Sequence, residues 1–231
     1  MKDLSHFLGS GVKAFFTDAS VDFQRHEKSL VLTEDQSSYL RSLSMDPRRV
    51  AHIHQVHGDG VLMVDEAYVR EGCVVDADAV VTSDPSLILT IRTADCVPVF
   101  LYDEKAGAIG LAHAGWRSAA ENIIAKTIGM MSKKLGASTG SMKAALGPSI
   151  RSCCYQVGQE FCGIFPEHVI PQNGNWYLDL QGACRMKLLR EGVLEENILD
   201  ASCCTCCSKD LFSYRRQKEK AGRHLSILQL V

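Results

Sequence analysis

The sequence has no long apolar segment, no marked excess of charge of one sign and no stretch of low complexity. No apolar run reaches the roughly 18 residues of a membrane-spanning helix, and the first 20 residues lack the continuous apolar stretch of a secretory signal. Lysine and arginine number 25 against 27 aspartate and glutamate, so the formal net charge is only -2. This balance gives no reason to expect nucleic acid or a membrane surface as a partner. We therefore expect a cytoplasmic protein that binds neither.

The sequence also lacks internal repeats and any linker rich in proline, glycine and serine. Its 231 residues are 46% hydrophobic and 23% charged, which are ordinary values for a globular protein. A chain of this length can bury a sizeable core. We expect one domain that comprises residues 1–231, and the oligomeric state stays open.

Short apolar runs rich in β-branched residues dominate the chain from Val50 onward. Gly, Pro, Asp and Ser bound these runs, as is typical of the ends of strands. The expected strands are 50–56, 61–65, 77–82, 87–94, 97–103, 108–114, 143–150 and 224–231. Several are apolar throughout, which indicates a sheet covered on both faces.

The hydrophobic period changes to a helical one after residue 117. Ser118 and Glu121 have the spacing of a capping box, and Gly136 is suited to end the same helix. A second amphipathic helix is expected to begin after Asp179 and to end near Gly192. Many short strands with a few long helices predict an α+β (mixed α/β) fold, a layered domain in which mixed β-sheets are flanked by helices.

Three residues with metal-binding side chains lie at the ends of predicted strands. They are His57 before Gly58, Cys96 between two apolar runs, and His113 close to Gly115. Zinc binds imidazole and thiolate in tetrahedral geometry, and catalytic zinc sites leave one of four positions open. By spacing alone the three residues fit either such a zinc site or ordinary packing within the core.

Two further polar residues lie close to these ligands in the sequence. Arg117 directly precedes the predicted helix cap, where free backbone amides favour an anion and a guanidinium adds a bidentate contact. Phosphate is therefore a candidate ligand, while the alternative is a solvated arginine beside amides that Ser118 already caps. Asp95 is a candidate for substrate binding, for orienting a metal ligand or for capping a turn.

The ten cysteines do not have the even spacing of a secreted disulfide framework. Cys153 and Cys154 are adjacent, and 203–207 reads "CCTCC". This segment is able to bind a second metal, but we favour reduced, buried thiols.

Five motifs occur in the order "HQVHGD", "TADCVPV", "HAGWR", "GPSIRSCCYQVG" and "LFSYRR", between His54 and Arg216. Together they resemble the YfiH-like family, whose members are also called laccase-domain or multicopper polyphenol oxidase-like proteins. The resemblance covers about two-thirds of the chain. It implies that His57, Cys96 and His113 bind zinc and carry the catalysis.

The resemblance implies a purine nucleoside enzyme that uses nucleoside and phosphate. The expected reactions are phosphorolysis of adenosine, inosine or 5′-methylthioadenosine, and deamination of adenosine. One alternative is a cysteine hydrolase in peptidoglycan precursor editing, with Cys96 as nucleophile and His113 as base. Another is a non-catalytic, thiol-rich redox or scaffold protein. Polyphenol oxidation ranks lower, because several copper sites require more histidine pairs than eight scattered histidines supply.

Three positions depart from the family pattern. Ser118 replaces the glycine that follows HAGWR, and Ala221 replaces the threonine of a Thr-Gly-Arg run. The family often has a single Cys-Thr where this chain has "CCTCC". These differences affect the expected rim contacts and substrate preference, but not the three metal ligands.

Overall fold

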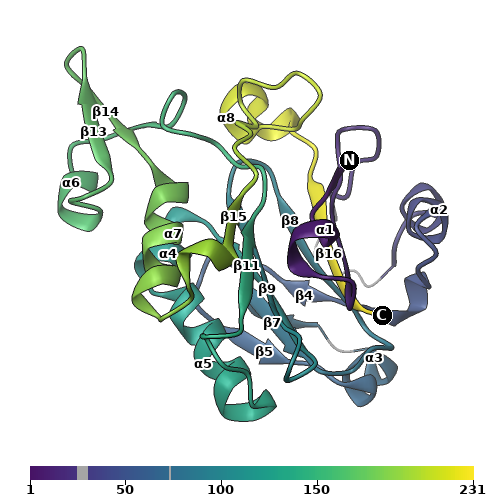
Figure 1. The fold of residues 1–231 in the computed structure, drawn as a ribbon. Helices are drawn as coiled ribbons and strands as arrows, with labels where there is room; N and C mark the ends of the chain where they lie inside the picture. Colours follow the sequence, from purple (N-terminus) through teal and green to yellow (C-terminus); the bar gives the residue numbers. More distant parts are fainter. Residues whose placement is uncertain (25–30, 73) are drawn as a thin grey trace.

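The protein is built from stacked layers of sheet and helix (Figure 1). The computed structural model describes residues 1–24, 31–72 and 74–231. A six-stranded mixed sheet has two helices on one face and a five-stranded mixed sheet on the other. The expected α+β fold class, with mixed sheets flanked by helices, is thereby confirmed.

The elements have the following bounds. The six-stranded sheet has the order β15 (Ile198–Asp200), β11 (Lys143–Leu146), β9 (Val97–Asp103), β10 (Ala108–Ala114), β7 (Ala79–Thr82) and β5 (Val61–Met63). The five-stranded sheet has the order β1 (Lys2–Asp3), β2 (Val12–Phe16), β16 (His224–Leu230), β8 (Ile88–Thr93) and β3 (Val50–Ala51). Two small sheets contain β4 (Ile53–His54) with β6 (Val75–Asp76), and β12 (Gln156–Val157) with β14 (Asn175–Leu178) and β13 (Val169–Gln172). The α-helices are α1 (Ser5–Leu8), α2 (Glu34–Ser42), α3 (Glu66–Glu71), α4 (Trp116–Ala120), α5 (Ile123–Leu135), α6 (Phe161–Ile164), α7 (Leu180–Arg190) and α8 (Tyr214–Gln217). Short 3₁₀ turns occur at η1 (Pro47–Arg49), η2 (Glu195–Asn197) and η3 (Lys218–Lys220).

Strand β9 is apolar from residue 97 to residue 102 because both of its faces are covered. Val99 and Leu101 point into the core beneath helices α5 and α7, whereas Phe100 and Tyr102 point into the core shared with the five-stranded sheet. Alternate residues of a strand face opposite sides, so a central strand between two apolar layers needs apolar residues on both. The expectation of a sheet covered on both faces is confirmed.

The helix predicted from Ser118 to Gly136 is in fact two helices. Helix α4 begins after Gly115, and Ser118 lies buried inside it without a hydrogen-bond partner for its hydroxyl among the described residues. The predicted capping box is therefore wrong. Asn122 adopts a left-handed conformation with φ of 67° and separates α4 from α5. Gly136 ends α5 with φ of 72°, as expected.

Most of the other predicted elements are confirmed by the structure, and one predicted strand is not. Helix α7 begins at the Asp179 cap, as expected, and strands β5, β7, β8, β9, β10, β11 and β16 lie within the predicted runs. The run 50–56 is not one strand, because β3 and β4 belong to different sheets. Residues 31–48 contain helix α2 and the 3₁₀ turn η1.

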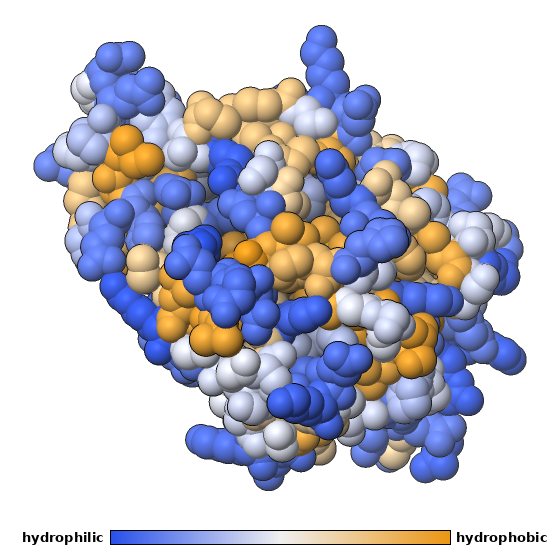
Figure 2. All heavy atoms as spheres, viewed as in Figure 1, coloured by the Kyte–Doolittle hydropathy of each residue, from blue (hydrophilic) through white to orange (hydrophobic). Residues whose placement is uncertain are grey.

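The outer face of the five-stranded sheet carries a third apolar cluster beside helix α2. Leu40 of α2 packs there with Ile88 and Ile227 of the sheet. On the face shown in Figure 2, hydrophilic side chains alternate with smaller apolar areas. Among the described residues, no helix has the length and apolarity needed to cross a membrane.

Candidate metal centre and its pocket

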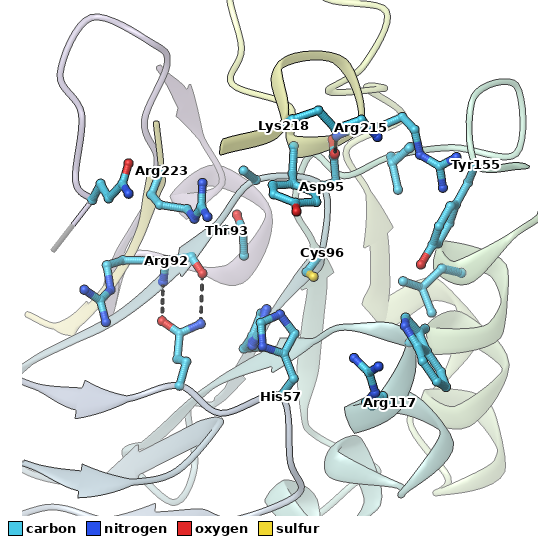
Figure 3. A pocket seen from close by; sticks show the side chains of 18 of the residues that line it. His57, Arg92, Thr93, Asp95, Cys96, Arg117, Tyr155, Arg215, Lys218 and Arg223 are labelled. Carbon is cyan, nitrogen blue, oxygen red and sulfur yellow. Dashed lines mark hydrogen bonds between the residues drawn. The ribbon is translucent and has the colours of Figure 1, made fainter. Parts of the chain in front are cut away.

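His57, Cys96 and His113 come together at one end of the layered sheets. His57 lies in the loop after β4, Cys96 in the turn between β8 and β9, and His113 near the end of β10. Their ligand atoms all lie within 4.8 Å of one another. The centroids of the His57 and His113 rings are 4.7 Å apart, and the ring planes are inclined at 76°. In Figure 3 the Cys96 sulfur points toward the His57 ring.

A buried carboxylate, that of Asp78, orients both histidines. It accepts the backbone amides of Val56, His57 and Gly58 at 3.2, 3.0 and 2.7 Å, and so holds the loop in which His57 has φ of 58°. The same carboxylate lies 2.8 Å from Nδ1 of His113. This bond leaves Nε2 of His113 as the nitrogen able to bind a metal. Sequence analysis missed Asp78 because no motif spacing marks it.

The electrostatics favour a thiolate at Cys96. Burial raises the pKa of the Cys96 thiol, but His113 and His57 outweigh burial and lower it to about 6. Burial lowers the pKa of His113, yet the neighbouring Cys96 and Asp78 raise it to about 9. Without a metal, the two residues are therefore a thiolate and an imidazolium at neutral pH. A thiolate is also the form in which cysteine binds zinc.

Gly115 leaves space that the three candidate ligands require. A Cβ atom at this position would lie 3.2 Å from the Cys96 sulfur and 3.2 Å from Cδ2 of His57. Both neighbours are ligand side chains, so a larger residue would displace them. The glycine of the HAGWR motif is thus explained by close approach to the ligands.

The three ligands lie in a pocket of about 750 Å³ (Figure 3). One group of lining residues is aromatic or aliphatic: Trp116, Ile150, Tyr155, Leu180 and Tyr214. Another group is cationic: Arg92, Arg117, Arg215, Lys218 and Arg223. The pocket therefore combines a candidate metal-binding triad with an apolar wall and several positive charges. Among these cations, sequence analysis predicts a role only for Arg117, although Arg215 lies in the motif "LFSYRR" and Arg223 in the run compared with Thr-Gly-Arg.

Arg117 lines the pocket, but not at the predicted place in its helix. It is the second residue of α4, whose cap is Gly115, so the prediction that it precedes the cap is wrong. Helix α4 has only five residues, too short to argue for an anion at its N-terminus. The guanidinium lies 4.4 Å from the centre of the Trp116 ring and has no hydrogen-bond partner among the described side chains and backbone atoms. Any contact with an anion there rests on the guanidinium itself.

Asp95 holds the C-terminal wall of the pocket. Its carboxylate accepts hydrogen bonds from Thr205 Oγ1 at 2.6 Å, Ser213 Oγ at 3.0 Å and the Arg215 amide at 2.6 Å. Its backbone carbonyl accepts the amide of Ile150 at 2.9 Å. These bonds engage both carboxylate oxygens with protein donors. Substrate binding by Asp95 stays a prediction, and its observed contacts are those of a positioning residue.

The cysteines of "CCTCC" are not buried. Cys207 is exposed, and Cys203, Cys204 and Cys206 are partly exposed. Two of them, Cys204 and Cys207, form a second cluster with Cys153 and Cys154, all four sulfurs lying within 4.8 Å of one another. The interpretation of this segment as buried thiols is therefore wrong.

A family model described as "Multi-copper polyphenol oxidoreductase laccase" matches residues 9–231. The chain belongs to this family. It is 34% identical over 208 residues to a purine nucleoside phosphorylase of Bacteroides thetaiotaomicron, with 83% of this chain and 77% of that protein covered. It is 32% identical over 185 residues to the adenosine deaminase RL5 of an unknown prokaryotic organism, with coverages of 73% and 70%.

A solved structure supports the same family assignment. The hypothetical protein YfiH of Bacillus licheniformis matches this fold with a TM-score of 0.84 at 27% identity, with 95% of this chain and 93% of that chain covered. The resemblance to the YfiH-like family is thereby confirmed along nearly the whole chain.

Proposed function

We propose that this protein is a zinc-dependent enzyme of purine nucleosides. Its reactions are phosphorolysis of adenosine, inosine and 5′-methylthioadenosine, and deamination of adenosine. The observation that carries the proposal is the convergence of His57, Cys96 and His113 in a pocket lined by cations and aromatic rings. The relatives named purine nucleoside phosphorylase and adenosine deaminase support the substrate class. We further propose that residues 1–231 form one catalytic domain.

Two imidazoles and one thiolate suit zinc. Three protein ligands with one open position are typical of catalytic zinc, and Asp78 fixes the ring of His113 as carboxylates commonly do for such ligands. When bound, zinc supplies a Lewis acid that is able to lower the pKa of a water to about 7. Copper fits less well, because neither metal-binding cluster among the described residues contains more than two histidines.

We also propose roles for the residues of the pocket wall. The aromatic rings of Trp116 and Tyr155 offer flat apolar surfaces suited to a purine base. The Arg117 guanidinium lies against the Trp116 ring but has no hydrogen-bond partner among the described residues, so it is available for bidentate binding of phosphate. Phosphorolysis requires this anion beside the ribose, while deamination does not. The same pocket therefore serves both reactions with different co-substrates.

The proposal is tested by following adenosine with and without phosphate. Inosine and ammonia should form in both conditions, whereas adenine and ribose 1-phosphate should form only with phosphate. His113→Ala should abolish both activities, because it removes a metal ligand and the partner of Asp78. An active His113→Ala protein would refute the proposal.

Arg117→Ala separates phosphate from nucleoside binding. We expect it to weaken phosphorolysis by about 1.5–3 kcal/mol, the value of a hydrogen bond to a charged group, while deamination and zinc content stay unchanged. Arg190→Ala is a matched control, since Arg190 forms an exposed ion pair with Glu167 outside the pocket. Equal losses of both reactions in Arg117→Ala would assign the arginine to nucleoside binding instead.

A cysteine hydrolase is the second candidate, and the Cys96–His113 pair is the observation that favours it. The low pKa of Cys96 beside His113 is typical of a nucleophilic thiolate. Metal content separates the two functions, because a zinc-bound thiolate is not free to attack. Turnover of thiol-reactive esters by zinc-free protein, lost in Cys96→Ala, would favour the hydrolase.

A further inference from the structure

Four cysteines from two distant segments form a cluster outside the pocket described above. Cys153 and Cys154 lie in the turn after β11, and Cys204 and Cys207 lie in the turn before α8. The Cys207 sulfur is 3.3 Å from that of Cys154 and 3.6 Å from that of Cys153, and the latter two are 3.8 Å apart. All four are free thiols, and none lines the nucleoside pocket.

The spacing of the four sulfurs matches a tetrahedral metal site. Four sulfurs bound to one zinc ion at about 2.3 Å are separated by about 3.8 Å. The measured separations of 3.3, 3.6 and 3.8 Å lie around this value, and all pairs fall within 4.8 Å. A disulfide would need one pair at about 2.05 Å, and it would use only two of the four.

The local backbone also suits a thiolate ligand. Cys204 and Cys207 have Cys-x-x-Cys spacing, and the backbone amides of Arg151, Cys206 and Cys207 are hydrogen-bonding partners of the Cys204 sulfur. Such donors stabilise negative charge on sulfur. The turn therefore presents both sulfurs on one side, with amides directed at one of them.

Contacts around the cluster hold its two segments together before any metal binds. Ser149 and Cys204 form a parallel bridge, in which the Thr205 amide donates to the Ser149 carbonyl at 3.0 Å. Arg151 pairs with Asp200 at 2.8 Å. A guanidinium, that of Arg216, donates to the carbonyls of Thr205, Cys206 and Ser208 at 3.0, 2.7 and 2.8 Å. The four thiols are thus preorganised rather than brought together by flexible loops.

We propose that Cys153, Cys154, Cys204 and Cys207 bind a second, structural zinc ion. The four thiols release their protons on binding, and their thiolates fill all four positions, so that no open position is left for catalysis. The ion would join two segments of the chain. One is the turn directly before Tyr155, and the other contains Thr205, whose hydroxyl donates a hydrogen bond to Asp95. The ion therefore fixes two parts of the pocket wall relative to each other, and exposed Cys153 and Cys207 leave a path for the metal.

The test is a zinc count on the full-length protein, purified under reducing conditions from zinc-supplemented medium. Wild type should contain about two zinc ions per chain, with His113→Ala and Cys207→Ser each losing about one and the double variant losing both. Cys206→Ser is the matched control, because Cys206 lies in the same turn but outside the cluster, and it should keep both ions. Cys207→His should also keep both, since zinc accepts three cysteines and one histidine.

Cobalt gives a second readout that does not depend on total metal. In a His113→Ala background, added cobalt should produce strong thiolate charge-transfer absorption, which Cys207→Ser should weaken and Cys206→Ser should not. A wild type with about one zinc, lost in His113→Ala but kept in Cys207→Ser, would overturn the proposal. A disulfide between any two of the four cysteines, in protein purified under reducing conditions, would also overturn it. Iron in place of zinc would overturn the choice of metal.

Discussion

The carboxylate of Asp78 links the loop of His57 to the ring of His113, so one residue positions two of the three candidate metal ligands. It accepts three backbone amides and the His113 ring, and it is fully buried. A neutral amide in its place offers one acceptor oxygen and two unwanted donor hydrogens. The geometry of both histidines therefore depends on negative charge at this position.

We expect Asp78→Asn to lower zinc affinity 10–100-fold, as is typical when a carboxylate behind a ligating histidine is lost, at a cost of about 1–3 kcal/mol in stability. Competition with a chelator measures the affinity. Asp76→Asn is a suitable control, because Asp76 contacts His54 rather than a ligand of the triad. Equal zinc affinity in Asp78→Asn and wild type would contradict the role of Asp78.

Gly115 gives a second test at the level of one atom. The added methyl of Gly115→Ala meets Cys96 and His57 at 3.2 Å, so we expect a loss of zinc and of activity with little change in thermal unfolding. Gly129→Ala is the control, since a Cβ at Gly129 in α5 has no neighbour within 4 Å. That variant should keep its zinc and gain up to about 1 kcal/mol in stability, because alanine favours a helix over glycine. Unchanged zinc content and activity in Gly115→Ala would show that the ligands can move aside.

At the scale of the elements, the break between α4 and α5 decides where the pocket residues lie. The sequence around it has a continuous helical period, which predicts a single helix. The left-handed conformation of Asn122 interrupts that period, and the short α4 then carries Trp116 and Arg117 to the pocket. Spacing of apolar residues cannot reveal a single residue with positive φ.

We expect this break to respond to backbone preference at Asn122. Glycine accepts positive φ without strain, whereas a valine there should cost about 1–2 kcal/mol. Both Asn122→Gly and Asn122→Val remove the same side-chain contact with Lys187. The difference between their free energies of unfolding in urea therefore isolates the backbone conformation. Equal stability of the two variants would contradict this explanation of the break.

Strands were the more predictable part of the molecule. Runs such as 97–102 and 108–112 are apolar throughout because both faces of β9 and β10 are covered, and that pattern is visible in sequence. The three predicted metal ligands also meet, since each lies where a strand or its adjoining loop reaches the same end of the sheets. Asp78 could not be predicted, because its role depends on the fold around it.

At the scale of the whole molecule, topology brings together residues that sequence spacing separates. Strands β11 and β15 pair in parallel, with Leu146 opposite Asp200, and this pairing places the turn of Cys153 beside the turn of Cys207. The C-terminal strand β16 lies between β2 and β8 in the five-stranded sheet. Both arrangements depend on long-range pairing, which a local pattern does not encode.

The position of His224 at the start of β16 makes the whole fold sensitive to acid. Its ring is fully buried and packs 4.7 Å from Phe16 and 5.2 Å from Phe212, while Nε2 accepts the Phe212 amide at 2.7 Å. Burial lowers the pKa of His224 from 6.5 to about 4. The unfolded chain therefore binds a proton between about pH 6.5 and pH 4 that the folded protein does not.

It follows that the free energy of unfolding should fall as the pH drops from 6.5 toward 4, with a contribution from His224 on the order of 3 kcal/mol. Above pH 6.5 this contribution is absent, because His224 is neutral in both states. Urea unfolding at several pH values should show a shallower decline in His224→Gln, since glutamine keeps an acceptor for the Phe212 amide but does not titrate. His54→Gln is the matched control, because it makes the same substitution at a partly exposed histidine. The same slope in His224→Gln and wild type would mean that other groups govern acid unfolding.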